Sequence, residues 1–107
     1  MSDPNIVGEI YEPDIHDGAI LKVQHTGTTA RILVKAYEGQ LYAFQFDLVE
    51  SIKSFEPEGM MLYSLIEMRA VKPFRRFVFT NWAENESMLE VVAQQIEVDE
   101  IVSEAAF

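Results

Sequence analysis

The chain has 107 residues, no cysteine and a formal net charge of −10. This length fits one domain, and the seven Phe, four Tyr, one Trp and five Met supply a core that needs no disulfide or thiolate metal site. No apolar run is long enough to cross a bilayer and the first residues lack the features of a secretory signal, so we expect a soluble cytoplasmic protein with no membrane partner.

The charge is concentrated at the two ends of the sequence. Residues 1–17 hold five acids and residues 84–107 hold seven, and neither segment contains Lys or Arg. Residues 18–83 hold six acids and all eight basic residues, a net charge of +2. The simpler interpretation of the acidic ends is solubility. The functional interpretation is an acidic surface that docks a basic partner.

We expect a single domain over residues 1–107. Its parts would be a less regular acidic N-terminal segment (1–17), a β-rich core (19–82) and an acidic C-terminal strand or helix (84–107). Residues 6–11 could form a short strand or a helical turn, after which Pro13 and Asp17-Gly18 break the chain.

From Ala19 to Trp82, apolar residues recur at every second position, which is typical of half-buried strands. The runs 19–26, 29–37 and 41–55 are predicted strands, separated by turns at residues 26–28 and 38–39 that each contain a glycine. The last of these runs would bury Glu50 if its alternation were unbroken. We therefore expect a bend or bulge near 47–50, which would let the sheet curl over its own core.

The remaining segments are less distinctive. Residues 60–70 are good helix formers, but their alternation and the turns on both sides favour a strand. Residues 74–82 carry apolar side chains on both faces, which indicates a strand covered on two sides. For the tail we predict a strand at 88–98 and a short helix at 99–106, with a single helix over 86–106 as the alternative.

The predicted fold is therefore mainly β, with an α+β arrangement as the alternative class. We expect a small antiparallel β-barrel or a strongly curved sheet of six or seven strands, with a short C-terminal helix at its end or edge.

The chain contains no nucleophile elbow, P-loop or glycine fingerprint, so we predict no catalytic residue, no cofactor and no metal. His16 lies beside Asp17 and near Glu12 and Asp14, which makes a cation or zinc site conceivable, but the spacing matches no known loop. His25 is expected to be a partly buried, hydrogen-bonded residue on the apolar face of a strand.

Half of the basic residues fall within eight positions and are interleaved with Phe74 and Phe77: Arg69, Lys72, Arg75 and Arg76. Such a mixture could hold single-stranded nucleic acid by stacking and phosphate contacts. The twelve acids of the two ends oppose that partner, so nucleic acid is disfavoured. We expect these bases to pair with the acidic tail instead.

The predicted function is a non-catalytic, bacterial-type interaction module that binds a protein partner, basic in the simplest case, through its acidic terminal segments. An inhibitor or immunity-like role would be one example. The candidate interaction residues are Arg69, Arg75, Arg76, Trp82, Glu97, Asp99 and Glu100.

Two alternatives remain open. The first is a small-ligand carrier whose cavity is lined by Tyr42, Phe44 and Phe46, although a plain core is the simpler interpretation of these aromatic residues. The second is a homo-oligomer that associates through an uncovered sheet edge or through the face of Phe74 and Trp82.

Overall fold

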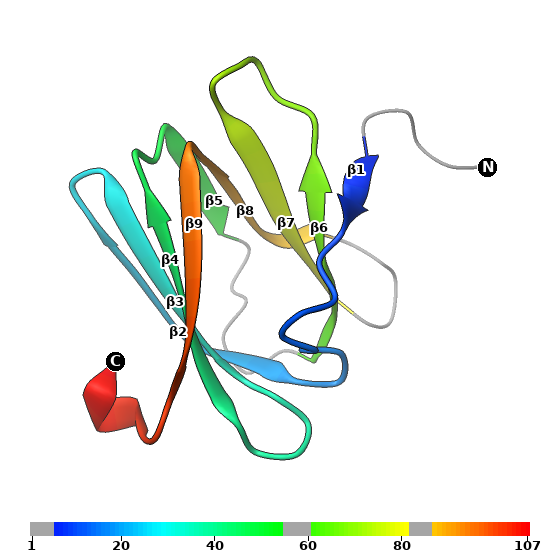
Figure 1. The fold of residues 1–107 in the computed structure, drawn as a ribbon, viewed down its shortest axis with the longest axis vertical. Coiled ribbons are helices and arrows are strands. Elements are labelled where there is room, and N and C mark those ends of the chain that lie inside the picture. Colours follow the sequence, from blue (N-terminus) through cyan, green and yellow to red (C-terminus); the bar gives the residue numbers. More distant parts are fainter. Residues whose placement is uncertain (1–5, 55–60, 82–86) are drawn as a thin grey trace.

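The computed structural model describes residues 6–54, 61–81 and 87–107. These residues form nine strands and one 3-10 turn, arranged in two antiparallel sheets (Figure 1). Sheet A has the strand order β1-β6-β7-β8-β5, and sheet B has the order β2-β3-β4-β9. The strands are β1 (Ile6–Glu9), β2 (Ala19–Thr26), β3 (Thr29–Lys35), β4 (Leu41–Asp47), β5 (Ser51–Ser54), β6 (Leu62–Met68), β7 (Arg75–Asn81), β8 (Ser87–Ala93) and β9 (Gln95–Ile101).

Glycine residues form the tips of the first two hairpins, as the sequence predicts. Gly27 has φ of 59° and Gly39 has φ of 103°, values that a residue with a side chain rarely adopts. The predicted strands at 19–26, 29–37 and 60–70 are confirmed as β2, β3 and β6, and the strand predicted at 74–82 is confirmed as β7. Of the two possibilities for residues 6–11, a strand or a helical turn, the structure shows a strand, β1, which pairs with β6.

Two chain segments pass from one sheet to the other at a shared corner. β4 and β5 are joined by three residues that include Leu48, whose φ is 54°, and β8 and β9 are joined by Gln94. β4 pairs with β9 and β5 pairs with β8, so the same two segments are neighbours in both sheets. The amide of Glu50 donates to the Val92 carbonyl at 2.7 Å, and the amide of Gln94 donates to the Asp47 carbonyl at 3.2 Å. The bend predicted at 47–50 is thus confirmed, and it leaves Glu50 exposed.

The core lies between the two sheets and is built around four phenylalanines. Phe44 and Phe46 of β4 meet Phe77 and Phe79 of β7, and all four side chains are fully buried. The ring centroids of Phe44 and Phe79 are 5.7 Å apart in an edge-to-face arrangement, and those of Phe46 and Phe77 are 5.2 Å apart. Such pairs contribute about 0.5–1.5 kcal/mol beyond the burial of their area. Phe44 and Phe46 are therefore part of the packed core between the sheets.

The loop between β1 and β2 joins the sheets at a second place. The amide of Asp17 donates to the Leu62 carbonyl at 3.0 Å, and the amide of Leu62 donates to the Gly18 carbonyl at 2.8 Å. A single bridge between Ala19 and Met61 continues this contact. Within the described residues the strands form two separate sheets that these hydrogen bonds connect, and the predicted small β-barrel is not confirmed.

The C-terminal prediction needs correction. The tail forms two strands, β8 and β9, because Gln94 turns the chain into the other sheet. A single helix over 86–106 is wrong, since both strands satisfy their backbone groups by pairing with β4, β5 and β7. The predicted helix at 99–106 is also not confirmed, because β9 continues to Ile101 and only Glu104–Ala106 form a 3-10 turn. The strand count rises from six or seven to nine because the bend and the tail each yield two strands, and β1 adds another.

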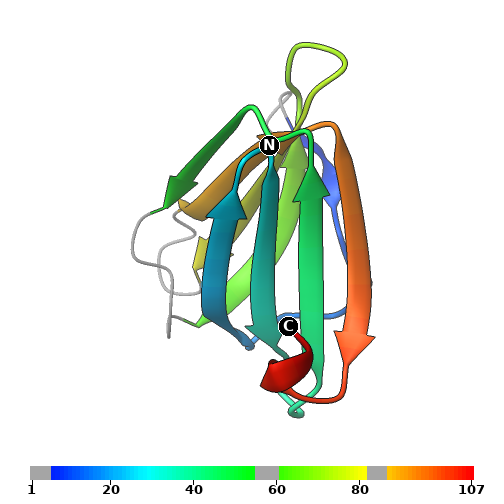
Figure 2. The same ribbon diagram turned by 90° about the vertical axis from the view of Figure 1, so that its left-hand side faces the viewer.

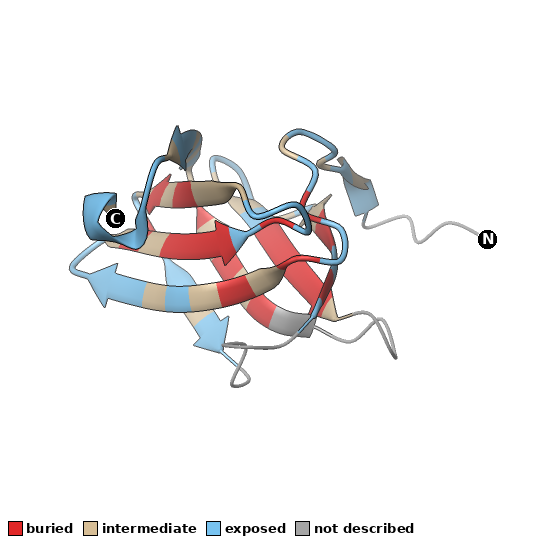
Figure 3. Ribbon diagram, turned by 90° about the horizontal axis from the view of Figure 1, so that it is seen from below, coloured by how far each residue is buried: buried red, intermediate tan, exposed pale blue. Residues whose placement is uncertain are grey.

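The last residues fold back over the outer face of sheet B (Figure 2). The Arg31 guanidinium lies 4.6 Å from the centroid of the Phe107 ring, and its Nη1 donates to the Phe107 carbonyl at 2.7 Å. On the same outer face Leu33 and Ala43 are buried. Figure 3 shows the buried residues gathered on strands of both layers, with the C-terminal turn exposed.

Candidate functional site

The sequence-predicted interaction residues do not form one site. Glu97 and Asp99 are exposed on β9, an edge strand of sheet B. Arg69 and Arg76 are exposed on sheet A, at the end of the β6–β7 hairpin. Trp82 lies outside the described residues. The structure therefore separates the acidic tail strand from the basic hairpin.

Arg75 pairs with a neighbouring strand and not with the tail. Its Nε and Nη2 donate to the two carboxylate oxygens of Glu67 at 2.9 and 2.8 Å, and its guanidinium lies 5.0 Å from the Phe77 ring centroid. The hydrogen bonds that Arg75 donates to Glu67 raise the pKa of Arg75 above its ordinary value, and burial acts in the opposite direction. Among the described residues Arg75 makes its ion pair with Glu67 and none with the acidic tail. The charge of Arg75 is thus paired within sheet A.

A different group of residues converges at the opposite end of the molecule. Two adjoining clefts of about 330 and 390 Å³ share the side chains of Asp14 and His16. The clefts are lined by all four tyrosines of the chain together with four carboxylates. We call this surface the tyrosine–carboxylate end, and it comprises Tyr11, Tyr37, Tyr42, Tyr63, Glu9, Asp14, Asp17 and Glu38 around His16.

The loop of residues 10–18 carries four of these side chains, those of Tyr11, Asp14, His16 and Asp17. Its first residue is anchored by the Ile10 amide, which donates to the Leu65 carbonyl at 2.8 Å. Ile15 is buried in the core, so the loop cannot lift away without exposing it. Asp17 adopts a φ of 63°, and the Gly18 amide donates to the Ile15 carbonyl at 2.9 Å. These contacts leave Asp14, His16 and Asp17 exposed on the outside of a fixed loop.

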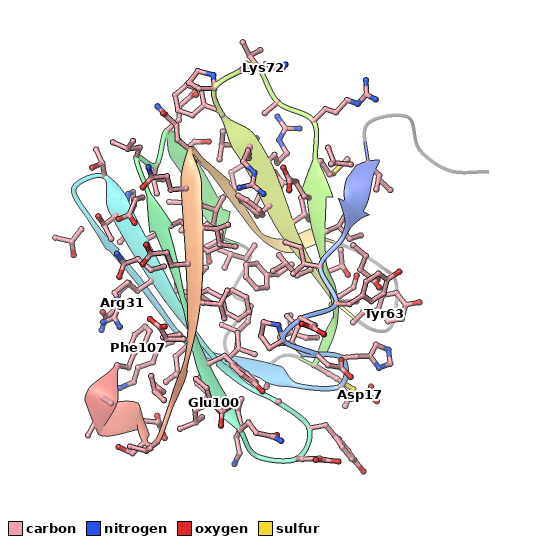
Figure 4. The ribbon with its side chains drawn as sticks, viewed as in Figure 1. Asp17, Arg31, Tyr63, Lys72, Glu100 and Phe107 are labelled. Carbon is pink, nitrogen blue, oxygen red and sulfur yellow. The ribbon has the colours of Figure 1, made fainter. Side chains whose placement is uncertain are left out.

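A β-bulge places Tyr63 at this end. In the pairing of β6 with β7 the register shifts between Leu62 and Ser64, so Tyr63 is the extra residue. The bulge allows Leu62 and Leu65 to be buried together, while Tyr63 remains 39 % exposed beside the loop (Figure 4). Its ring packs edge-on against His16, with centroids 5.2 Å apart.

The β3–β4 hairpin supplies the other wall. The amides of Ala36 and Gly39 close the turn by donating to the carbonyls of Gln40 and Ala36, at 2.8 and 2.9 Å. This turn projects Tyr37, which is 78 % exposed. Tyr42 follows on β4, and its partner on β9 is Glu100, so both side chains lie on the same face of sheet B. Glu100 is thus the tail residue that adds its charge to this end.

His16 sits between the two clefts and among carboxylates. Its amide donates to Asp14 Oδ1 at 3.0 Å, and its Nδ1 lies 3.4 Å from Asp17 Oδ2. No Lys or Arg is among the described residues that line the two clefts, although Lys35 lines a neighbouring hollow with Asp17. The surface is therefore an acidic one with aromatic walls, a combination that attracts cations.

The same geometry bears on metal binding and catalysis. Among residues 6–54, 61–81 and 87–107, no three histidine or carboxylate side chains converge on a point that could hold a metal ion. Ser64 lines one cleft, but its Oγ is 2.9 Å from Thr80 Oγ1, where the two buried hydroxyls satisfy each other. Among the hydrogen bonds of the described residues, none joins a hydroxyl to His16. A nucleophile–base pair would require such a bond. His25, which was expected to be partly buried, is exposed near the end of β2.

The sequence signal for this site was partial. The acidic segment 1–17 and His16 are distinctive in the sequence, but the tyrosines are spread from position 11 to position 63, and the sequence indicates only Tyr42 among them as a site residue. One sequence feature does indicate the site: Tyr11 and Tyr37 each lie within two residues of an acidic residue in a turn.

No protein-family model, no curated protein and no solved structure matches this chain. No helix within the described parts of the chain is long and apolar enough to span a membrane. We therefore infer function from the geometry and charge of the clefts.

Proposed function

We propose that the protein is a non-catalytic interaction module that binds a basic protein partner through the tyrosine–carboxylate end. The observation that carries this proposal is the gathering of all four tyrosines around Asp14, Asp17 and their neighbouring carboxylates. A tyrosine ring presents a negative face and a carboxylate a negative charge, so both favour a Lys or Arg side chain.

The arrangement also suits a protein surface more than a small ligand. The two clefts are open and lie side by side, so two basic side chains of one partner could occupy them together. Tyr11 and Tyr37 are largely exposed, and tyrosine is enriched at interfaces because it supplies a large contact area with few rotatable bonds. The acids of β9, Glu97 and Asp99, would add a long-range field that speeds the encounter with a basic partner.

The test is the binding of an oligo-arginine peptide to the full chain, measured by calorimetry. The double variant Asp14→Asn, Asp17→Asn should weaken binding about tenfold, because each exposed charge pair contributes up to about 1 kcal/mol and ~1.4 kcal/mol is a factor of ten. Asparagine keeps the oxygen that caps His16 and tolerates the left-handed backbone at position 17, so the loop should stay folded. Binding should also weaken steeply as salt rises.

The matched control is Glu97→Gln, Asp99→Asn, which removes the same charge from the outer face of β9. This control should change affinity no more than about twofold if the clefts carry the binding and the net charge does not. Equal losses in the two double variants, or an oligo-glutamate peptide that binds as well as oligo-arginine, would contradict the proposal.

Self-association must be distinguished from binding to a foreign partner, because the basic hairpin of one copy could contact the tyrosine–carboxylate end of another. Light scattering on the unmodified chain distinguishes the two. A mass that stays at one chain across low and high salt assigns the peptide binding to a foreign partner, whereas a mass that rises at low salt assigns the tyrosine–carboxylate end to contacts between copies.

A further inference from the structure

Another cleft lies at the end of the molecule opposite the tyrosine–carboxylate end. Lys72 marks this end in Figure 4, whereas Asp17 and Glu100 mark the other, along a longest axis of 36 Å. The cleft has a volume of about 620 Å³, within the range of small-molecule sites. We call it the hairpin cleft, and its lining consists of Val7, Glu67, Met68, Arg69, Ala70, Lys72, Pro73, Phe74 and Arg75.

The apolar part of the hairpin cleft comes from two strands and a turn. β1 pairs with β6 with a register shift between Ile6 and Gly8, so Val7 is a bulged residue and is 59 % exposed beside the cleft. Met68 and Phe74 are only partly covered. The turn is closed by the Phe74 amide, which donates to the Val71 carbonyl at 3.0 Å. Since bulges often re-aim a side chain beside a binding site, the exposure of Val7 is consistent with such a role.

The charged part of the hairpin cleft is cationic. Glu67 and Arg75 neutralise each other through their two hydrogen bonds. The other two cationic side chains of the cleft are those of Arg69 and Lys72. Within the described residues no carboxylate lies within ion-pair distance of either. Both are exposed at the rim.

A neighbouring cleft of about 440 Å³ extends the same surface. It shares Arg69, Ala70 and Phe74 with the hairpin cleft and adds the exposed Arg76. One carboxylate, that of Glu50, also lines it. Among the residues that the structure describes, this end therefore offers three cations without an ion pair, Arg69, Lys72 and Arg76, against one such acid, Glu50, around an apolar floor.

We infer that the hairpin cleft binds a single-chain anionic amphiphile, such as a long-chain carboxylate. The alkyl chain would lie along Val7, Met68 and Phe74, and the carboxylate would meet Arg69 and Lys72 at the rim. The net charge of −10 does not prevent this, because a Debye length of about 8 Å at physiological salt screens acids at the far end of the molecule. This site is separate from the tyrosine–carboxylate end, so a negative result for decanoate would leave the proposed function unaffected.

The test uses monomeric sodium decanoate with the full chain, followed by amide chemical shifts. Decanoate should shift the amides of Arg69, Lys72 and Phe74 in a saturable manner, and acetate at equal concentration should not. The double variant Arg69→Gln, Lys72→Gln should lower decanoate affinity at least tenfold, and Val7→Ser should lower it severalfold. The control Lys22→Gln, Lys53→Gln, which removes the same charge from exposed sites elsewhere, should leave affinity within twofold.

Three results would overturn the inference. The first is decanoate producing no saturable shifts at the hairpin. The second is dodecyltrimethylammonium, a cationic amphiphile, binding there as well as decanoate does. The third is binding only to vesicles that contain phosphatidylglycerol, which would assign the hairpin to a membrane surface and not to a free ligand.

Discussion

Replacing Phe79 by alanine is expected to lower the free energy of unfolding by about 3–5 kcal/mol, the usual cost of deleting a buried phenylalanine. Phe79 is fully buried on β7 and packs against Phe44 and Phe46 of the other sheet, with centroids 5.7 and 6.4 Å away. The loss should be large because the cavity opens between two sheets, where no single strand can move to fill it. Urea denaturation followed by circular dichroism measures the change.

The control for this prediction is Val102→Ala. Val102 is 97 % exposed, so its truncation should change the free energy of unfolding by less than about 0.5 kcal/mol. A loss at Phe79 smaller than about 1 kcal/mol would mean that the two sheets do not share a tightly packed interior.

Gly18→Ala is expected to destabilise the protein by about 3 kcal/mol, at the upper end of the range for overpacked sites. A Cβ at this position would lie 2.5 Å from the Lys35 carbonyl oxygen and 2.9 Å from the Ile15 carbonyl oxygen. Both are backbone atoms that no rotamer change can move. The loop of residues 10–18 would have to shift, and because this loop carries Asp14 and Asp17, the affinity for oligo-arginine should fall as well.

Gly8→Ala is the matched control for the steric argument. Nothing lies within 4 Å of a Cβ built at Gly8, and its φ is not positive, so the same substitution should change the free energy of unfolding by less than about 0.5 kcal/mol. Thermal unfolding of both variants compares them directly. Equal stability of the two variants would show that the loop tolerates displacement at Gly18.

The features that the sequence predicted well depend on local chemistry. The turns at Gly27 and Gly39 require a positive φ that glycine supplies, and the bend before Glu50 follows from the cost of burying its carboxylate. Such constraints act within a few residues. For this reason hairpins and the mainly β class could be predicted without knowing which strands pair.

The features that the sequence did not predict depend on distant partners. The bulges at Val7 and Tyr63 are set by the registers of β1 and β7 against β6, and the corner at Gln94 is set by the two sheets that it connects. Alternation of apolar residues does not reveal an extra residue in one strand. The tyrosine–carboxylate end is not evident from the sequence for the same reason, because Tyr11, Tyr37 and Tyr63 reach the two adjoining clefts only after three separate connections are folded.

The distribution of charge was only partly predictable. The acidity of both terminal segments is evident from composition, but the partner of Arg75 is not. The register of the β6–β7 hairpin brings Met68 opposite Arg76. Glu67 and Arg75, which precede these two residues, therefore lie diagonally across the two strands and can form their ion pair. A nearby carboxylate on a paired strand thus displaced the tail as the partner.

The most direct test of the central claim is amide chemical-shift mapping of the chain with oligo-arginine. If the tyrosine–carboxylate end is the binding surface, the largest shifts should fall on Tyr11, His16, Tyr37, Glu38 and Tyr63, from three separate parts of the sequence. Shifts confined to the outer face of β9 at Glu97 and Asp99, or spread evenly over all acidic residues, would contradict it.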